Sequence, residues 1–535
     1  MAERLRFLPA GSNAMLVELD DLETTLALLD GLQAGRPEGV FELVPAARTL
    51  LVSFDTLTTN RTALVQAISS IDLSHRSSRQ GETFEVPVAY DGEDLNDVAD
   101  LLGWSADELI RHHTEATYTV AFTGFAPGFA YMTSDDPALD VPRRKSPRVR
   151  IPAGSVALGG KFGGIYPTDS PGGWQLLGHT PLKTWDISRC RAALLAPGDR
   201  VRFRDMAKGA TVSLSAAPSQ SGTPRLTSNT SGGLLVTRTD RPALFQDLGR
   251  PGQAGQGISE SGALDRAALA EANLCVGNPR GSAAIEIAYG GFAIRADRPV
   301  TLAVTGAPAP TTIRSLDGKT VGAPFGQPFA LDAGDELRLE FPPEGTRSYL
   351  AIRGGFAVER LLDSAATDTL AKIGPAPIVT GDLLVPASER VSAVDPDRPA
   401  LAKLPKEGDT ATLDVVLGPR TDWFTEKGIS TFLTQEWQVT AESSRVGIRL
   451  AGAESLEKAV TSELPSEGTS LGAVQVPHTG QPVLFLADHP LTGGYPVIGA
   501  IASHHLDLAG QVPIGGKIRF NAIAAFDPFI REPDR

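Results

Sequence analysis

Hydrophobic and polar positions alternate in short runs along this chain, and helix-like spacing is brief. In residues 1–82, two segments carry apolar residues three and four apart, which predicts helices at Asp21–Leu32 and Ala63–Ile71. The strand-like apolar runs in the same region are Ala14–Leu19, Phe41–Val44 and Thr49–Phe54. Two helices over a small sheet can each bury one face. We therefore expect a small N-terminal α/β domain.

The pattern changes at Thr83 and becomes strand-rich. Glu85–Val88 predicts a strand, and Leu95–Gly103 and Ser105–Thr114 predict two short helices, of which the second begins with the capping-box sequence Ser-Ala-Asp-Glu. Neither helix is basic, and strands and glycine loops follow at once, so a helix-turn-helix DNA reader is not expected. Residues 83–206 are predicted to form a β-rich domain.

Residues 207–233 consist mainly of Ser, Thr, Gly, Ala and Pro, which predicts a flexible linker. Beyond it, residues 234–535 form a second strand-rich unit, with a helix predicted at Arg266–Val276. A charged, Pro-rich connector near residues 395–408 suggests that this unit has two lobes. The stretch Gly334–Leu339 is similar to the strand that ends each repeat, so a third barrel-like module stays an open alternative.

One pattern occurs twice. Gly172-Gly173-Trp174-Gln175-Leu176-Leu177-Gly178 is followed by a strand ending in Arg202-Phe203. Gly493-Gly494-Tyr495-Pro496-Val497-Ile498-Gly499 is likewise followed by a strand ending in Arg519-Phe520. Repeats of this size indicate a shared architecture. We expect two related barrels whose glycine-lined mouths face one common cleft.

Composition limits the class of protein. Gly (55) and Pro (40) are abundant, which favours short strands and tight turns. The net charge of −14 argues against a nucleic-acid partner, because phosphate binding needs clustered Lys and Arg. The one dense basic stretch is residues 143–150, a solvated turn or an anion-facing loop.

Cysteine content and hydropathy predict a cytoplasmic location. The two cysteines, Cys190 and Cys275, lie in different units, so neither a disulfide framework nor a cysteine metal site is expected. The first six residues are charged and lack the apolar core of a signal peptide. No apolar run approaches the roughly 18 residues of a membrane span. No membrane or metal is expected as a partner, whereas a homo-oligomer is possible.

Candidate chemistry gathers at the glycine blocks. Residues 122–131 alternate aromatics with Gly and Pro, as a barrel core or an aromatic pocket wall would. In residues 151–181, successive glycines are expected to leave amides free for an anion. Cationic, proton-transfer and hydroxyl groups accompany them at Lys161, Tyr166, Asp169, Ser170, His179 and Thr180.

The second unit offers a similar set of polar residues near its glycine loops. Carboxylate recognition and acid–base capacity are expected of residue types such as Arg, Asp, Glu and His. The candidates are Arg250, Asp265, Asn273, Glu286, Gln475, His478, Asp488, Thr492, Gly493, Gly494 and Tyr495.

These blocks resemble the KipI and KipA families, also called the B and C subunits of 5-oxoprolinase or allophanate hydrolase subunits 1 and 2. Residues 124–131, 152–157, 164–167 and 170–174 are similar to the signature of the B subunit. Residues 246–252, 261–265, 475–477 and 492–496 are similar to that of the C subunit. The resemblance implies a mainly β protein with α+β additions and tandem cyclophilin-like β-barrels.

The resemblance also implies a component of an ATP-dependent 5-oxoprolinase that works with a separate A subunit to open the lactam of 5-oxoproline to glutamate. In that hypothesis the catalytic residues are His179, Asp265, His478 and Asp488. The substrate-binding residues are Lys161, Tyr166, Ser170, Gly172, Gly173, Arg250, Asn273, Glu286, Gln475, Thr492, Gly493, Gly494 and Tyr495. ATP, with magnesium, would bind here or with the partner subunit.

Two other functions stay open. Relatives in urea carboxylase suggest a biotin-dependent carboxyltransferase of the allophanate hydrolase type, although none of the four methionines lies in a biotinylation-like site. KipI-like proteins can inhibit a sensor histidine kinase, for which residues 1–206 would suffice. A shared active site explains the covalent joining of both units, and simple inhibition does not.

Overall fold

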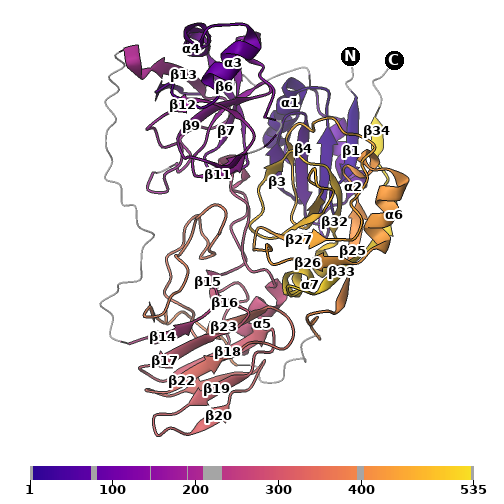
Figure 1. The fold of residues 1–535 in the computed structure, drawn as a ribbon. Coiled ribbons are helices and arrows are strands. Elements are labelled where there is room, and N and C mark those ends of the chain that lie inside the picture. The colour runs from indigo at the N-terminus through magenta and orange to yellow at the C-terminus, as the bar shows by residue number, and fades with distance from the viewer. Residues whose placement is uncertain are drawn as a thin grey trace.

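The computed structural model describes residues 4–73, 81–144, 146, 148–189, 191–208, 232–394 and 403–531 (Figure 1). It is mainly β. In chain order it contains a small N-terminal α/β domain, a first barrel, a two-sheet unit and a second barrel, so the predicted fold class is confirmed. Most of the predicted linker 207–233, and residues 395–402 of the predicted connector, lie outside the described residues. No helix in the described ranges is long and apolar enough to cross a membrane.

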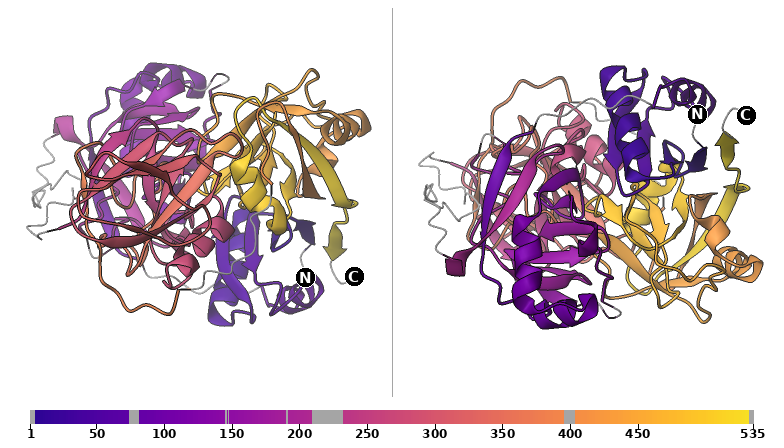
Figure 2. Two further views of the ribbon diagram at one scale, coloured as in Figure 1. Left: turned by 90° about the horizontal axis from the view of Figure 1, so that it is seen from below. Right: turned by 90° about the horizontal axis from the view of Figure 1, so that it is seen from above.

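The N-terminal domain is a five-stranded sheet in the order β3-β4-β2-β1-β34. Both helices pack on one face, where Leu28, Leu64 and Ile68 join the strand side chains in a single core. The edge strand β34 comes from the end of the described chain and pairs with β1, so the first and last strands lie side by side (Figure 1 and Figure 2). The elements are β1 Leu5–Pro9, β2 Ala14–Glu18, α1 Leu22–Ala34, β3 Val40–Pro45, β4 Thr49–Phe54, α2 Arg61–Ser69 and β34 Phe529–Arg531.

The first barrel is a seven-stranded sheet in the order β12-β9-β10-β7-β6-β13-β5. An isolated bridge between Ala89 and His179 connects its two edge strands and closes it. At the start of α4, the Ser105 hydroxyl accepts the N–H of Glu108 as predicted, whereas the Glu108 carboxylate lies 4.0 Å from Arg111. The elements are β5 Thr83–Val88, α3 Leu95–Leu102, α4 Ala106–Glu115, β6 Tyr118–Thr123, β7 Ala130–Ser134, η1 Pro137–Leu139, β8 Arg148–Ile151, β9 Ser155–Gly159, β10 Phe162–Ile165, β11 Ser170–Gly172, β12 Gln175–His179, β13 Arg200–Asp205 and η2 Met206–Lys208.

Residues 232–394 form two sheets around one apolar core, with α5 against the second sheet. The orders are β20-β19-β22-β17-β14-β24 and β15-β16-β23-β18-β21. The stretch Gly334–Leu339 contributes β22 to the first sheet, so its similarity to a barrel-closing strand does not extend to a third closed barrel. The elements are β14 Leu234–Thr239, β15 Ala243–Gln246, η3 Ala254–Gln256, α5 Arg266–Cys275, β16 Ala284–Ala288, β17 Phe292–Ala296, β18 Val300–Gly306, β19 Thr311–Arg314, β20 Thr320–Gly322, β21 Phe329–Leu331, β22 Glu336–Leu339, β23 Arg347–Ile352 and β24 Leu383–Leu384.

The second barrel is closed, in the order β25-β32-β29-β30-β27-β26-β33. It packs beside the N-terminal domain, as Figures 1 and 2 show. Its core is filled by Trp437, Phe432, Phe520 and aliphatic side chains. The elements are β25 Thr410–Leu417, η4 Thr421–Trp423, α6 Glu426–Thr434, β26 Trp437–Val439, β27 Gly447–Ala451, β28 Glu467–Gly468, β29 Ala473–Gln475, β30 Val483–Phe485, β31 Thr492–Gly493, β32 Val497–Ile501, η5 Ser503–His505, α7 Leu506–Gln511 and β33 Lys517–Ala524.

The two barrels have one topology. Reading β5-β12-β9-β10-β7-β6-β13 against β25-β32-β29-β30-β27-β26-β33 matches every strand, including the parallel pairs β5–β13 and β25–β33. The sequence repeat lies at equivalent strands, because Gly172 pairs with Arg148 in β8 and Gly493 pairs with Glu467 in β28. The repeat therefore reports a duplicated barrel.

A buried ion pair of the two barrels is reversed in charge. The amide of Asp94 bonds the Leu176 carbonyl in the first barrel, and the amide of Arg420 bonds the equivalent Val497 carbonyl in the second. Asp94 pairs with Arg148 at 2.8 Å, and Arg420 pairs with Glu467. The same position thus fixes the small β8–β11 or β28–β31 sheet to its barrel with opposite charges.

Candidate functional site

The aromatic residues of the first barrel form a packed wall. Phe129 lies 5.0 Å from Tyr131, 5.3 Å from Tyr166 and 5.4 Å from Trp174 between ring centroids, in edge-to-face contacts. The predicted aromatic stretch therefore belongs to a buried cluster of the first barrel, against which Leu22, Leu26 and Ala46 of the N-terminal domain pack.

The glycine block 151–181 makes room for this wall. A Cβ on Gly164 would lie 2.9 Å from Phe129, and a Cβ on Gly159 would lie 2.7 Å from the ring of Trp174. Gly163 and Gly164 belong to β10, which is paired with β9 and β7. The expectation of free amides for an anion is wrong at these two positions, because a central strand uses its amides in the sheet.

The described arginines of the basic stretch 143–150 pair with the protein's own carboxylates. Arg144 and Arg148 both bind Asp94, and Arg150 binds Asp169 at 2.7 Å. Arg143 lies 3.3 Å from Glu463 of the second unit. Each of the four described arginines is therefore paired, and the anion-facing alternative for this stretch is not supported.

The glycine–aromatic blocks of the two barrels meet. A Cβ on Gly124 would lie 2.6 Å from the hydroxyl oxygen of Thr492, and the Tyr131 hydroxyl is 3.4 Å from that same oxygen. Arg143 reaches from the first barrel to Gly494, and its guanidinium lies 5.9 Å from the Trp174 ring. The Gly-Gly-aromatic segments of both repeats thus lie at one junction.

A loop of the middle unit, residues 250–262, completes this junction. The Thr123 hydroxyl donates to the Gly255 carbonyl at 2.9 Å, and the Gly128 amide donates to the Gln256 carbonyl at 3.1 Å. On the other side, the Ala254 amide donates to Glu42 of the N-terminal domain at 3.3 Å. Burial raises the pKa of Glu42 to about 7. We call the meeting point of residues 123–130, 250–262 and 488–494 the three-way junction.

The motif that starts at Gln246 holds a second loop, residues 361–373. Gln246 donates to the Thr367 carbonyl at 2.8 Å. The carboxylate of Asp247 accepts the Ser364 hydroxyl and the Ala365 amide, each at 2.7 Å. These bonds place Asp368 and Thr369 beside the three-way junction, although the sequence separates them from it.

Four charged side chains from four segments are buried together, and we call Arg250, Asp368, Arg445 and Asp488 the buried charge cluster. Arg445 binds both carboxylate oxygens of Asp488 at 3.0 Å and also bonds Glu286. Asp488 further accepts the Ser261 hydroxyl and the Thr369 hydroxyl, each at 2.7 Å. Bidentate Arg–carboxylate bonding of this kind is rigid.

Arg250 has unused bonding capacity within the cluster. It is 1% exposed and donates through one terminal nitrogen to the Ala366 carbonyl, while its Nε and Nη1 atoms are buried without a partner among the described residues. Such unsatisfied donors are rare in native interiors because they cost about 1–3 kcal/mol each. A guanidinium with two free N–H groups is suited to a carboxylate.

The two aspartates of the cluster differ in pKa. Burial and the neighbouring charge of Asp488 raise the pKa of Asp368 to about 7. Burial also favours protonation of Asp488, but the charge and hydrogen bonds of Arg445 overcome it and hold the pKa below its usual range. A carboxyl group with a pKa near neutrality can both take and give a proton.

Some predicted residues have structural partners. Asp265 caps α5 by accepting the Ala268 amide at 2.8 Å, and burial raises its pKa to about 6. The Asn273 side chain donates to the Leu269 and Ser282 carbonyls. Glu286 accepts the Leu264 amide, the Tyr349 hydroxyl and Arg445.

The predicted residues of the second repeat lie together. Gln475 donates to the Tyr495 carbonyl at 3.1 Å, and a Cβ on Gly493 would lie 2.5 Å from its amide nitrogen. His478 is exposed and 5.0 Å from the Tyr495 ring. This group adjoins the three-way junction through Thr492 and Gly494.

The remaining predicted residues of the first barrel are not brought into this group. His179 is exposed at the end of β12, where it pairs with Asp91 at 2.8 Å on the seam of the barrel. Lys161 is exposed beside Gly160 in the β9–β10 turn. The Tyr166 hydroxyl lies against Gly172, and the Ser170 hydroxyl donates to the Thr168 carbonyl.

Sequence reasoning missed Asp368, Thr369 and Arg445. Each stands in an ordinary polar loop, and none belongs to a recognisable motif. The only sequence signal for the two acidic or basic partners was indirect. A buried arginine such as Arg250 requires an anionic partner, but the sequence does not tell which residue supplies it.

Two family models match this chain. The carboxyltransferase domain, subdomain C and D, matches residues 5–195. The carboxyltransferase domain, subdomain A and B, matches residues 256–522.

Named relatives and a solved structure agree with these matches. The chain is 34% identical over 297 residues to the C subunit of 5-oxoprolinase from Escherichia coli K12, covering 54% of this chain and 90% of the relative. It is 46% identical over 128 residues to the B subunit of 5-oxoprolinase from Escherichia coli O157:H7, covering 23% of this chain and 59% of the relative. The crystal structure of TTHA0988 is 32% identical, with a TM-score of 0.80, over 95% of this chain and 100% of that one. The resemblance found in the sequence is confirmed.

Proposed function

Because this chain belongs to the carboxyltransferase-domain family, with subdomains C and D in its first half and A and B in its second, we propose that it is the joined B and C component of an ATP-dependent 5-oxoprolinase. ATP phosphorylates the lactam oxygen of 5-oxoproline, and water then opens the ring. ATP, 5-oxoproline and two molecules of water give glutamate, ADP and phosphate. The observation that carries this proposal is the contact of Thr492 with Gly124 and Tyr131, which joins the B-like and C-like blocks at one place.

Arg250 is the proposed binding residue for the substrate carboxylate. Its Nε and Nη1 atoms, which have no partner in the described part of the chain, leave N–H donors on two edges of the guanidinium, each free for a carboxylate oxygen. Binding would remove the cost of leaving them unsatisfied. The lactam would lie toward Thr492, Gly493 and Gly494, between Tyr131 and Tyr495. This placement needs loop 361–373 to move, because the guanidinium is buried beneath it.

Asp368 is the proposed proton-transfer group. With a pKa of about 7, it takes a proton from the attacking water and returns it to the ring nitrogen as the C–N bond breaks. Asp488 stays ionised against Arg445 and keeps the Ser261 and Thr369 hydroxyls in place. His478, exposed beside Tyr495, is the second proton-transfer candidate.

ATP is proposed to bind together with a partner protein related to the A subunit of 5-oxoprolinase. The relatives are named as subunits, which supports a multi-subunit system. The four described arginines of stretch 143–150 are paired with carboxylates, so this stretch is not our candidate for the phosphates.

The test combines the purified chain with a homologue of the 5-oxoprolinase A subunit, Mg-ATP and 5-oxoproline. We expect glutamate and ADP in equal amounts, and no turnover with either protein alone. Arg250→Met should lower kcat/KM at least a hundredfold. Arg238→Met should keep full activity, because Arg238 is a half-buried residue that pairs with Asp240 and Glu340 in the middle unit. Thermal melting of both variants separates lost binding from lost folding. Absence of glutamate from the complete mixture would refute the proposal.

A biotin-dependent carboxyltransferase is the second candidate, favoured by the description of both matching families. Carboxyl exchange between a biotinylated carrier and an amide substrate, without glutamate formation, would support it. The kinase-inhibitor alternative predicts activity for residues 1–206 alone, although those residues contact loop 250–262 and Thr492 here.

A further inference from the structure

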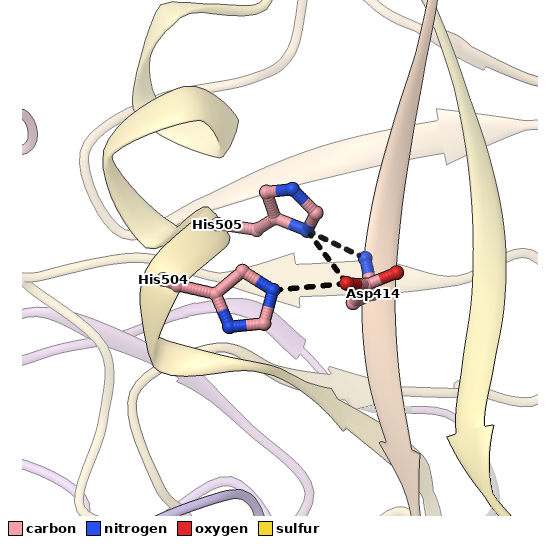
Figure 3. Close-up of side chains that lie close together, drawn as sticks. All are labelled: Asp414, His504 and His505. Atoms are coloured by element: carbon pink, nitrogen blue, oxygen red, sulfur yellow. Dashed lines mark hydrogen bonds and ion pairs between the residues drawn. The ribbon is translucent and has the colours of Figure 1, made fainter.

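Two histidines and an aspartate lie together on the second barrel, away from the three-way junction. Asp414 is in β25, and His504 and His505 form the end of η5, ninety positions further along the chain (Figure 3). The His504 Nε2 atom is 2.9 Å from Asp414 Oδ2, and His505 Nδ1 is 3.7 Å from that same oxygen. The two imidazole centroids are 4.4 Å apart.

These separations suit a small divalent metal. Ligand atoms about 2.0–2.1 Å from a tetrahedral metal ion are roughly 3.3 Å from one another. The two measured separations, 2.9 and 3.7 Å, lie on either side of that value. One suitable ligand atom from each of the three residues lies within 4.8 Å of the others.

The carboxylate is already oriented for such a role. The Asn521 side chain donates to Asp414 Oδ1 at 2.7 Å, which leaves Oδ2 facing both imidazoles. Outer hydrogen bonds of this kind orient metal ligands. The Asp414 amide also donates to His505 Nδ1 at 2.8 Å, so this nitrogen is an acceptor and carries no proton. A metal ion at Nδ1 would replace that N–H.

We propose that Asp414 Oδ2, His504 Nε2 and His505 Nδ1 bind a divalent transition-metal ion, with zinc as the best fit. Imidazole and carboxylate ligands suit zinc, cobalt and nickel, whereas magnesium and calcium prefer oxygen ligands. His504 is 57% exposed, so water completes the coordination. No motif in the sequence marks this set, because a strand and a distant short helix supply it.

The ion would tie β25 to the start of α7. That helix joins the second barrel to the middle unit, since Asp507 accepts the amides of Arg266 and Ala267. Gln511 at its other end donates to Asp265 at 2.7 Å. A metal ion at Asp414 would therefore stabilise α7, the helix through which the second barrel contacts the middle unit.

The test is zinc titration of tag-free full-length protein by calorimetry, followed by cobalt absorption spectroscopy. We expect one zinc per chain with micromolar affinity, and visible cobalt bands of a low-coordinate site. His504→Ala should weaken binding at least tenfold without affecting folding, because the side chain is largely exposed. Asp414→Asn should have the same effect on binding.

His112→Ala is the matched control, because His112 pairs with Asp136 at 2.6 Å and belongs to no such three-residue group among the described residues. It should bind zinc as the unmodified protein does. Zinc should also raise the melting temperature of the unmodified protein and not that of His504→Ala. Binding weaker than millimolar, or binding unchanged in His504→Ala and Asp414→Asn, would overturn the proposal.

Discussion

Replacing Arg445 by Met should destabilise the contact between the second barrel and the middle unit. Arg445 is the cation shared by Asp488 and Glu286, and both carboxylates are at most 3% exposed. Met retains much of the volume but leaves Asp488 without its bidentate cation and leaves Glu286 with only the longer 3.7 Å contact to Arg347. Removing one partner of a buried ion pair costs about 3–5 kcal/mol. For a folding unit of about 150–250 residues, this loss lowers the melting temperature by roughly 6–20 °C.

The effect should depend on pH with a defined sign. In the unmodified protein, Arg445 holds the pKa of Asp488 low against the effect of burial, so this aspartate stabilises the fold above about pH 4 and the stabilisation is lost as the pH falls. In Arg445→Met the charge and hydrogen bonds of Arg445 are gone, and burial, the largest single influence, then outweighs the hydrogen bonds from Ser261 and Thr369 and raises the pKa of Asp488. The variant therefore loses stability as the pH rises. The difference between the two proteins should be largest near pH 7 and should narrow toward pH 4.

The assay is thermal melting of both proteins from pH 4 to pH 8, with hydrogen exchange of residues 261–264 as a local probe. Arg449→Met is the control, because Arg449 faces Glu442 at 3.9 Å on the surface, where such pairs contribute about 0–1 kcal/mol. A loss below about 1 kcal/mol at pH 7, or a difference that stays constant down to pH 4, would refute the reasoning.

Three further predictions concern the junction. Glu42→Gln should raise the free energy of unfolding at pH 8 by about 3 kcal/mol and leave it unchanged near pH 4. The reason is that a carboxyl group whose pKa is raised to about 7 makes the folded state lose stability as the pH climbs from about 4.5 to 7. Equal melting shifts at both pH values would contradict this prediction. Gly124→Ala should cost about 1–3 kcal/mol through its clash with Thr492, and adding Thr492→Ala should recover most of the loss in a double-mutant denaturation series; additive losses would mean that the two barrels do not meet here. With a homologue of the A subunit present, kcat/KM of the unmodified protein should rise with pH through about 7, and Asp368→Asn should remove this rise. A rise that persists in the variant would exclude Asp368 as the base.

Several local features were predictable from the sequence because they depend on neighbouring residues. Alternating apolar runs predicted the strand-rich fold, and the helix predicted at Leu95–Gly103 is α3, Leu95–Leu102. The helix predicted at Arg266–Val276 is α5, Arg266–Cys275, with Asp265 as its N-cap. The repeated glycine pair and aromatic predicted the duplicated barrel, because the same strand and turn pattern must satisfy the same backbone hydrogen bonds.

The candidate site was predictable only in part. Arg250, Asp488 and Thr492 stood in glycine-rich motifs, and the structure brings them to the three-way junction. Asp368 and Arg445 stood in plain polar loops, yet they complete the buried charge cluster. His179 stood in the same kind of motif as Thr492 but lies on the barrel seam with Asp91. Glycines in the sequence indicate where two backbones can approach closely. They do not indicate which side chains then come into contact.

The sequence by itself determined the strands, the helices, the repeat and the family, since periodicity, capping and turn chemistry act over a few residues. Only the tertiary structure decided that β34 joins the first sheet, that Asp414 meets His504 and that Asp94 and Arg420 occupy equivalent positions with opposite charge. Such contacts join segments tens to hundreds of positions apart. The positive and negative members of such a buried pair can swap places without changing the hydrophobic pattern of the sequence around them, because burial requires only that each charge be compensated.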